Sequence, residues 1–148
     1  MAVTVRPLTA ADLPVWRDLW QGYLDFYKTE LAPEVSDSTW GRIIQPDGDL
    51  IGLGACVPDR GLVGIAHGLV HGGTWSPKPI CYVEDLYVSP AARGQGAGRA
   101  LIDHFAEMGR KAGWLRLYWQ TAQDNKTAQA LYDQMATRTG WVRYEMDL

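Results

Sequence analysis

The sequence predicts an α/β domain with a mixed central sheet flanked by helices, and three observations carry that prediction. Segments with the apolar period of a strand alternate with segments whose apolar residues recur every three or four positions, as in amphipathic helices. They follow the order β, α, α, β, β, β, α, β, α, β, without repeats or low-complexity linkers. The 148 residues, 47% of them hydrophobic, suit one domain spanning residues 1–148.

The N-terminal third is predicted to hold one strand and two helices. Residues 3–5 alternate valine with threonine, which is typical of a short strand. Thr9 or Asp12 offers an N-cap to a helix, and Pro14 favours Asp12 because proline is tolerated only in a first turn. A weaker helical pattern covers residues 38–44. The apolar face of the first helix comprises Leu13, Trp16, Trp20, Tyr23 and Tyr27.

Three strands are predicted in the middle of the chain, at residues 50–57, 61–70 and 80–88. The Pro58-Asp59-Arg60-Gly61 segment between the first two is typical of a tight turn, which predicts antiparallel pairing. A longer connection, residues 72–79, leads to the third strand.

The C-terminal half is predicted to alternate helices and strands. One helix ends at Gly113, and its apolar face comprises Leu101, Phe105, Met108 and Ala112. A strand over residues 114–120 follows. The next helix places Ala128, Leu131, Tyr132 and Met135 at i, i+3, i+4 and i+7. A last strand is expected over residues 141–146.

Composition excludes several classes of function. A formal net charge of -3 gives no general attraction to nucleic acid or to an acidic membrane. The first eight residues do not resemble a signal peptide, and no run of about 18 apolar residues occurs. We therefore expect a cytoplasmic protein that binds neither nucleic acid nor membranes.

No metal site is predicted. The two cysteines, Cys56 and Cys81, lie 25 residues apart and form no CxxC pair. His67 and His71 fall in an extended stretch, where a spacing of four does not bring side chains together as it does on a helix. These histidines are interpreted as surface or sheet residues.

The segment from Glu84 to Arg99 carries the clearest chemical signal, with the sequence EDLYVSPAARGQGAGR. A strand runs through a short loop into a helix whose first turn is rich in glycine. Backbone N–H groups at such a helix N-terminus can approach a phosphate closely and meet it with the positive end of the helix dipole. A Walker loop would need a Gly-Lys-Ser/Thr ending, and the spacing GxGxxG of dinucleotide sites is absent, so both of these motifs are excluded.

Arg93, Gly96 and Gly98 instead form the pattern Arg-x-x-Gly-x-Gly, which resembles the acetyl-CoA site of the GNAT superfamily of N-acetyltransferases. A second segment strengthens the resemblance: Asn125 and Tyr132 belong to an Asn-x-x-Ala-x-x-Leu-Tyr pattern similar to the family's own. Each feature also has a structural interpretation. The glycines can serve a turn, Asn125 can be a helix N-cap and Tyr132 a core aromatic.

The resemblance implies a GNAT (acyl-CoA N-acyltransferase) fold that binds acetyl-CoA as co-substrate, where strands 80–88 and 114–120 splay apart. Backbone groups of Leu86, Tyr87 and Val88 would bind the pantetheine arm. The pyrophosphate would be held next to Arg93 by Gly94, Gln95, Gly96, Ala97, Gly98 and Arg99. Asn125 would contact the cofactor, and Tyr132 would protonate the departing thiolate.

An alkylammonium has a pKa of about 10.4, so a bound amine must lose a proton before it attacks the thioester. Glu84 is the favoured base, with a water chain as the alternative, because similar enzymes place a carboxylate there. A backbone N–H of Leu86 or Tyr87 is a plausible donor to the oxyanion. Glu84 and Asp85 are neighbours on a strand and are expected to point to opposite faces. No cysteine is required.

The resemblance is greatest to the histone and polyamine acetyltransferase branch, which implies a small amine or a lysine-containing substrate, the small amine being preferred. Trp20, Tyr23, Tyr27 and Trp75 can surround an ammonium group, although core packing is the expected role of at least half of them. An acyl-CoA-binding sensor or scaffold without turnover is the alternative, and a nucleotide-binding domain is a third possibility. The last strand can pair with a second copy, which would give a homodimer.

Overall fold

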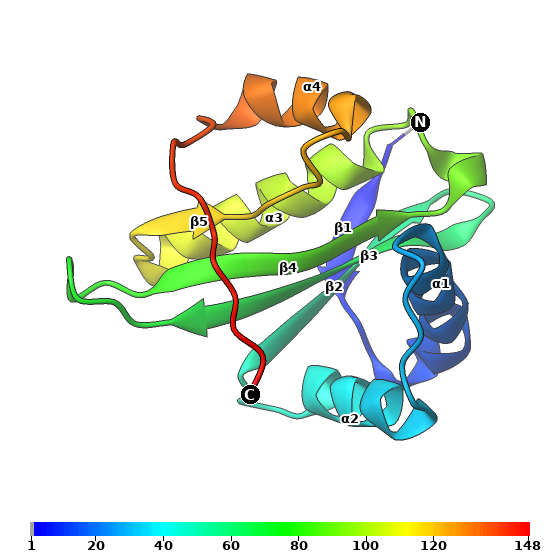
Figure 1. Ribbon diagram of the computed structural model, residues 1–148. Helices are drawn as coiled ribbons and strands as arrows, with labels where there is room; N and C mark the ends of the chain where they lie inside the picture. The colour runs from blue at the N-terminus through cyan, green and yellow to red at the C-terminus, as the bar shows by residue number, and fades with distance from the viewer. Residues whose placement is uncertain (1) are drawn as a thin grey trace.

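A computed structural model describes residues 2–148 as one mixed five-stranded sheet with helices on both faces (Figure 1). The sheet order is β1-β2-β3-β4-β5, and every neighbouring pair is antiparallel except the parallel pair β4 and β5. The predicted α/β class and mixed sheet are therefore confirmed. The elements are β1 (Thr4–Pro7), α1 (Leu13–Phe26), α2 (Pro33–Ile44), β2 (Leu50–Val57), β3 (Gly61–His71), β4 (Ile80–Val88), α3 (Ala97–Ala112), β5 (Arg116–Tyr118) and α4 (Lys126–Met135).

Helices α1 and α2 cover one face of the sheet, and α3 and α4 lie on the other side (Figure 1). On the α3 face, Leu101 and Phe105 are fully buried against the sheet. Gly68 of β3 makes room for Phe105, because a Cβ at that position would lie 2.7 Å from the ring. On the other face, Trp16 is the largest fully buried side chain. The sheet therefore separates two hydrophobic cores.

The strand prediction for the middle of the chain is confirmed, with β2 and β4 beginning and ending where expected. Asp59 and Gly61 adopt positive φ angles of 68° and 71° in the turn between β2 and β3, which pair antiparallel as predicted. Gly113 ends α3 with a φ of 77°. Helix α2 begins earlier than expected, with Pro33 in its first turn. Its only buried residues are Trp40 and Ile43, so the first half of the helix has no apolar face that would predict it.

The predicted last strand is wrong. Residues 136–148 form neither helix nor strand, and Trp141 and Tyr144 are 82% and 92% exposed. A strand needs a partner for its backbone hydrogen bonds. The neighbouring β5 is shorter than predicted, with only three residues, and offers little edge to pair with. The tail instead crosses the sheet near β4 (Figure 1), where Arg143 approaches the Tyr82 hydroxyl at 3.4 Å.

Two further findings concern residues 2–148. No helix in this part of the chain is long and apolar enough to cross a membrane. No group of three or more His, Cys, Asp or Glu side chains in the same residues is placed to hold a metal ion.

Candidate active site

Strands β4 and β5 separate after three paired positions, which creates an opening in the sheet. Ile80, Cys81 and Tyr82 of β4 pair with Arg116, Leu117 and Tyr118 of β5. Beyond Tyr82, β4 continues to Val88 with β3 on one side and no strand on the other. The rest of β4 therefore presents a free backbone edge, at the position where the resemblance to the GNAT superfamily implies that the two strands splay apart.

The glycine-rich loop lies at the end of this free edge and leads into α3. Gly94 and Gly96 have φ angles of 81° and 86°, which glycine adopts without the strain that a Cβ would cause. Gly96 is the N-cap of the 16-residue helix α3, and the first turn of that helix carries no acidic residue. The positive end of the helix dipole is thus open to an anion.

Gln95 adds a second ligand-binding feature to this loop. Its side-chain Oε1 is buried and accepts no hydrogen bond from residues 2–148. A buried acceptor without a donor costs free energy unless a ligand or water supplies one. The loop therefore offers a helix N-terminus that is open to an anion and one buried acceptor without a donor.

Arg93 does not point away from the sheet. Its Nε donates to the Val88 carbonyl at 3.2 Å, and its guanidinium lies 5.7 Å from the centre of the Tyr87 ring. Arg99, one turn into α3, donates to Gln134 Oε1 of α4 at 3.3 Å. These two arginines fasten the loop to β4 and α3 to α4.

Asn125 and Tyr132 lie on α4, which follows β5. Asn125 is the N-cap of α4, because its Oδ1 accepts from the Ala128 N–H at 3.2 Å. This structural interpretation is confirmed, and it leaves the side-chain NH₂ group of Asn125 available. Tyr132 stacks edge-on against Trp119 at 5.5 Å. Burial raises the pKa of Tyr132, so its phenol stays protonated at neutral pH.

A β-bulge in β4 changes the direction of two carboxylates. His67 of β3 pairs with Asp85, while the next residue, Gly68, pairs with Val83, so Glu84 has no partner in β3. A bulge interrupts the alternation of side chains between the two faces. The expectation that Glu84 and Asp85 point to opposite faces is therefore wrong: both line the same cavity.

This acceptor cavity, as we name it, has a volume of about 230 Å³ and lies between the sheet and helices α1 and α2. Its walls combine apolar and polar side chains and are charged at two places, one on β4 and one on α2. It is lined by Trp20, Leu31, Thr39, Arg42, Leu50, His67, Leu69, Glu84 and Asp85.

A buried chain of hydrogen bonds fixes Asp85 at the wall of the cavity. The Trp16 indole N–H donates to His67 Nε2 at 3.1 Å, and His67 Nδ1 lies 2.9 Å from Asp85 Oδ2. An indole nitrogen can only donate, so Nε2 must accept and Nδ1 must carry the proton that binds Asp85. The ring of His67 is thereby held as a neutral donor between the two partners.

The pattern of the sequence does not predict this chain of three residues. His67 was interpreted as a surface or sheet residue, and it is a sheet residue with 0% exposure. Trp16 and Asp85 lie 51 and 18 positions away from it. The one available signal was a histidine inside a run of small and apolar strand residues, where a buried polar group needs partners.

The charges of the two carboxylates affect their neighbours. Burial and the adjacent Asp85 raise the pKa of Glu84. Burial also raises the pKa of Tyr23, and the Asp85 carboxylate adds to that effect. The β4 wall of the acceptor cavity therefore carries two carboxylates, and the pKa of one of them, Glu84, is raised.

The comparisons with known proteins decide the family. Residues 5–136 match the model of the acetyltransferase (GNAT) family. The chain belongs to the GNAT family. Among its relatives is the D-amino-acid N-acetyltransferase HPA3 of Saccharomyces cerevisiae, which is 35% identical over 97% of this chain and 89% of its own length. A thialysine N-epsilon-acetyltransferase of Caenorhabditis elegans is 38% identical over 50% of this chain and 49% of its own.

Solved GNAT structures share the fold. A ribosomal-protein-alanine N-acetyltransferase from Brucella melitensis superposes with a TM-score of 0.82 at 25% identity, over 99% of this chain and 100% of its own. The aminoglycoside acetyltransferase AAC(6')-Iy, solved with a bisubstrate analogue that contains CoA, gives a TM-score of 0.84 at 19% identity, over 100% and 99%. The family match and the near-full-length similarity to HPA3 identify this GNAT protein as an acetyl-CoA-dependent N-acetyltransferase that acts on amines, as predicted.

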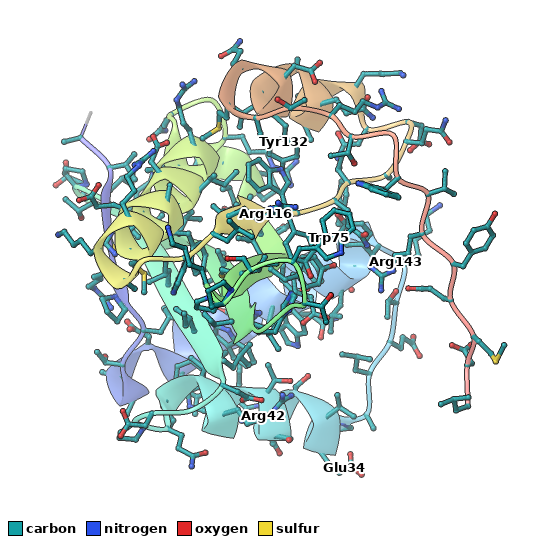
Figure 2. All side chains as sticks on the ribbon, turned by 90° about the vertical axis from the view of Figure 1, so that its left-hand side faces the viewer. Glu34, Arg42, Trp75, Arg116, Tyr132 and Arg143 are labelled. Carbon is teal, nitrogen blue, oxygen red and sulfur yellow. The ribbon has the colours of Figure 1, made fainter. Side chains whose placement is uncertain are left out.

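The aromatic residues expected at the substrate mouth of this GNAT protein divide into two groups. On α1, Trp20 stacks on Tyr23 at 5.0 Å, and Tyr23 contacts Tyr27 at 4.9 Å. Only Trp20 lines the acceptor cavity, and it is buried. Trp75 is 84% exposed and lies beside Arg116 (Figure 2), in a second surface hollow with Lys78. Trp75 therefore does not join the acceptor cavity.

Proposed function

We propose that this protein acetylates the primary amino group of a small molecule bound in the acceptor cavity. The observation that carries the proposal is the bulge in β4, which turns Glu84 and Asp85 into a cavity beside the free edge of the same strand. A volume of about 230 Å³ suits a small amine better than a folded polypeptide. HPA3 and the thialysine acetyltransferases are named for free amino acids, which supports a small acceptor.

Acetyl-CoA would lie along the free edge of β4, as a further strand does. Backbone groups of Leu86, Tyr87 and Val88 on the side away from β3 would bind the pantetheine arm. The pyrophosphate would lie on the loop at the N-terminus of α3, next to Arg93. The NH₂ group of Asn125 is free to donate to the cofactor. The contacts on the loop would come from Gly94, Gln95, Gly96, Ala97, Gly98 and Arg99.

The acceptor and Tyr132 lie on opposite sides of the sheet, with α2 below and α4 above in Figure 2. The separation of β4 and β5 beyond Tyr82 would connect the two sides. Burial raises the pKa of Tyr132, and Tyr27, which follows α1, adds to that effect. Transfer through this opening would bring the amine from the side of the acceptor cavity and the thioester from the side of α4.

Acetyl-CoA supplies an acetyl thioester, and the side chains of the protein move the protons. Glu84 takes the proton of the bound ammonium, directly or through a water, and its raised pKa makes it a better base than an ordinary carboxylate. The N–H of Leu86 or Tyr87 donates to the carbonyl oxygen as the N–C bond forms. Tyr132 gives its proton to sulfur as the S–C bond breaks, and the resulting tyrosinate takes the second proton that the nitrogen loses as it becomes an amide.

The test is a CoA-release assay with acetyl-CoA and a panel of amino acids, polyamines, lysine peptides and aminoglycosides. We expect turnover on a small amine and a decrease in kcat of about 100-fold in Tyr132→Phe, with unchanged acetyl-CoA affinity. Acetyl-CoA binding without turnover on any acceptor would favour the sensor alternative. Thermal stabilisation by ATP or NAD instead of acetyl-CoA would favour the nucleotide-binding alternative.

We also propose that the protein is cytoplasmic and forms a homodimer. The two copies would pair through their C-terminal tails. Val142, Tyr144, Met146 and Leu148 alternate with Arg143, Glu145 and Asp147, so the tail has the pattern of a strand without a partner. The four apolar side chains are 76% to 115% exposed. Light scattering is expected to give the mass of a dimer for the full chain and of a monomer after removal of residues 141–148. A monomeric full chain would refute this proposal without affecting the catalytic one.

A further inference from the structure

The acceptor cavity carries charges of both signs. Glu84 and Asp85 line it from β4, and Arg42 lines it from α2. Its lining also includes apolar side chains, among them Leu50 of β2 and Leu69 of β3. The cavity therefore carries two carboxylates on its β4 wall and one guanidinium on its α2 wall.

Arg42 is available to a ligand, in contrast to other arginines nearby. Arg143 forms an ion pair with Glu145 at 2.6 Å and also approaches Tyr82. Arg17 pairs with Asp37 at 3.0 Å, which connects α1 to α2. Arg42 forms no ion pair with any carboxylate of residues 2–148. A guanidinium at the wall of a cavity is suited to bind a carboxylate with two parallel hydrogen bonds.

The β4 wall of the cavity, which carries Glu84 and Asp85, is suited to an ammonium group. The hydrogen bond from His67 occupies Asp85 Oδ2 and fixes the orientation of the carboxylate. Burial and the adjacent Asp85 raise the pKa of Glu84, while the positive charges of Arg42 and Arg143 lower it. Arg42 is therefore close enough to influence Glu84 without neutralising it in an ion pair.

We propose that Arg42 binds a carboxylate of the acceptor, so that the preferred acceptor is a free amino acid whose ammonium group faces Glu84 and Asp85. The inference rests on the proposed function and adds a residue that determines specificity. It also explains product release. Acetylation removes the positive charge that Glu84 and Asp85 attract, while the carboxylate at Arg42 remains, so the product is held at one end only.

Arg42 also lies in the last turn of α2, where a positive charge stabilises the helix C-terminus. This structural role predicts that a substitution affects all acceptors alike. Binding of a carboxylate predicts an effect only on acceptors that have one. Pairs of acceptors that differ only by a carboxylate separate the two roles.

The experiment compares lysine with 1,5-diaminopentane and alanine with ethylamine, in wild type, Arg42→Gln and Arg42→Lys. In wild type we expect kcat/KM to be at least about 10-fold higher for the amino acid of each pair. In Arg42→Gln we expect a loss of about 10- to 100-fold for the amino acids, mainly through KM, and a change of less than about 2-fold for the amines. Arg42→Lys is expected to recover part of the preference, because lysine keeps the charge but not the two parallel hydrogen bonds.

Two matched variants serve as controls. Arg110→Gln removes an exposed arginine from the far side of α3 and is expected to change nothing. Arg143→Gln removes the other arginine near Glu84 and is expected to leave the preference for amino acids intact. Loss of that preference in Arg143→Gln rather than Arg42→Gln would overturn the inference, as would equal losses for amines and amino acids in Arg42→Gln.

Failure of the proposed function would look different. If wild type acetylates amines and amino acids equally well, the function holds and the role of Arg42 is refuted. If no acceptor is acetylated, calorimetry of amino-acid binding to the CoA-bound protein still tests Arg42. Binding that weakens at least about 10-fold in Arg42→Gln would support the inference without turnover. Absence of amino-acid binding in wild type would overturn it.

Discussion

The two halves of the active site are built in different ways. The acetyl-CoA half consists of two short continuous segments, residues 93–98 and 125–132, each following a strand of the parallel pair. The acceptor half is lined by side chains from five elements and from the loop after α1. The five elements are α1, α2, β2, β3 and β4. The first half relies on backbone conformation and a helix terminus. The second relies on side chains that meet only in the folded protein.

This difference has a functional consequence. A cofactor common to a whole family can be bound by backbone groups, which every sequence supplies. An acceptor that differs between family members must be recognised by side chains, which can change one at a time. Substitutions in the acetyl-CoA half should therefore change the affinity for acetyl-CoA. Substitutions in the acceptor half should change the KM for the acceptor or which acceptors are used.

The largest effect is expected for Glu84→Gln. Loss of a general base lowers kcat by about 100- to 10,000-fold. Burial raises the pKa of Glu84 above its usual 4.5, so in wild type kcat/KM should rise with pH as this carboxyl loses its proton at a pH above that value. The rise should be absent in Glu84→Gln, as measured by the pH profile of CoA release. The same loss in Asp85→Asn, with the rise retained in Glu84→Gln, would make Asp85 the base.

The next largest effect is expected for His67→Leu. It leaves the Trp16 N–H buried without an acceptor and Asp85 without its donor, which should lower the free energy of unfolding by about 2 to 4 kcal/mol. Urea denaturation measures that loss. In His67→Gln the amide can accept from Trp16 and donate to Asp85, so most of the stability and the acceptor KM should return. If Leu and Gln give equal losses, the hydrogen bonds of His67 do not hold Asp85 in place.

A smaller effect, confined to the acetyl-CoA half, is expected for Gly96→Ala. Alanine at a φ of 86° costs about 1 to 2 kcal/mol, and relaxation of the loop should weaken acetyl-CoA binding about 10-fold. Calorimetry measures the affinity, and the KM for the acceptor should not change. A change in acceptor KM of the same size would contradict the separation of the two halves.

The smallest effect is expected outside both halves, for Asp12→Asn. Two hydrogen bonds from Arg6, at 2.7 and 2.9 Å, lower the pKa of Asp12 from 3.8 to about 2. Because the folded pKa is the lower one, the stabilisation is present above about pH 4 and is lost as the pH falls to 2. Arg6 is nearly half exposed, so solvent screening limits the loss to about 1 kcal/mol. Thermal denaturation should show this difference at pH 7 and not at pH 2, with unchanged activity.

The same comparison explains what could be predicted from the sequence. The loop at Gly94 to Gly98 and the segment from Asn125 to Tyr132 are continuous, so their spacing indicated the family. Apolar runs broken by glycine and proline predict the bounds of β2 and β4. The roles assigned to individual residues of these segments stay predictions.

The remainder depends on contacts between distant parts of the chain. The bulge at Glu84 follows from the register between β3 and β4, and apolar alternation within β4 alone does not reveal it. The partners of His67 come from α1 and β4, far away in the sequence. The prediction of a last strand is wrong although the local pattern of residues 141–146 is that of a strand. Residues 2–148 provide no partner strand for it.

The packing of α1 also gives the protein an optical property. The indole rings of Trp16 and Trp20 are stacked with centres 5.8 Å apart and planes 12° from parallel. Electronic transitions of two chromophores so close together couple, so the pair should contribute a split band to the circular dichroism spectrum. Trp20 lines the acceptor cavity, and Trp16 binds His67. An acceptor that enters the cavity would perturb this pair, so binding can be followed without a label and without turnover.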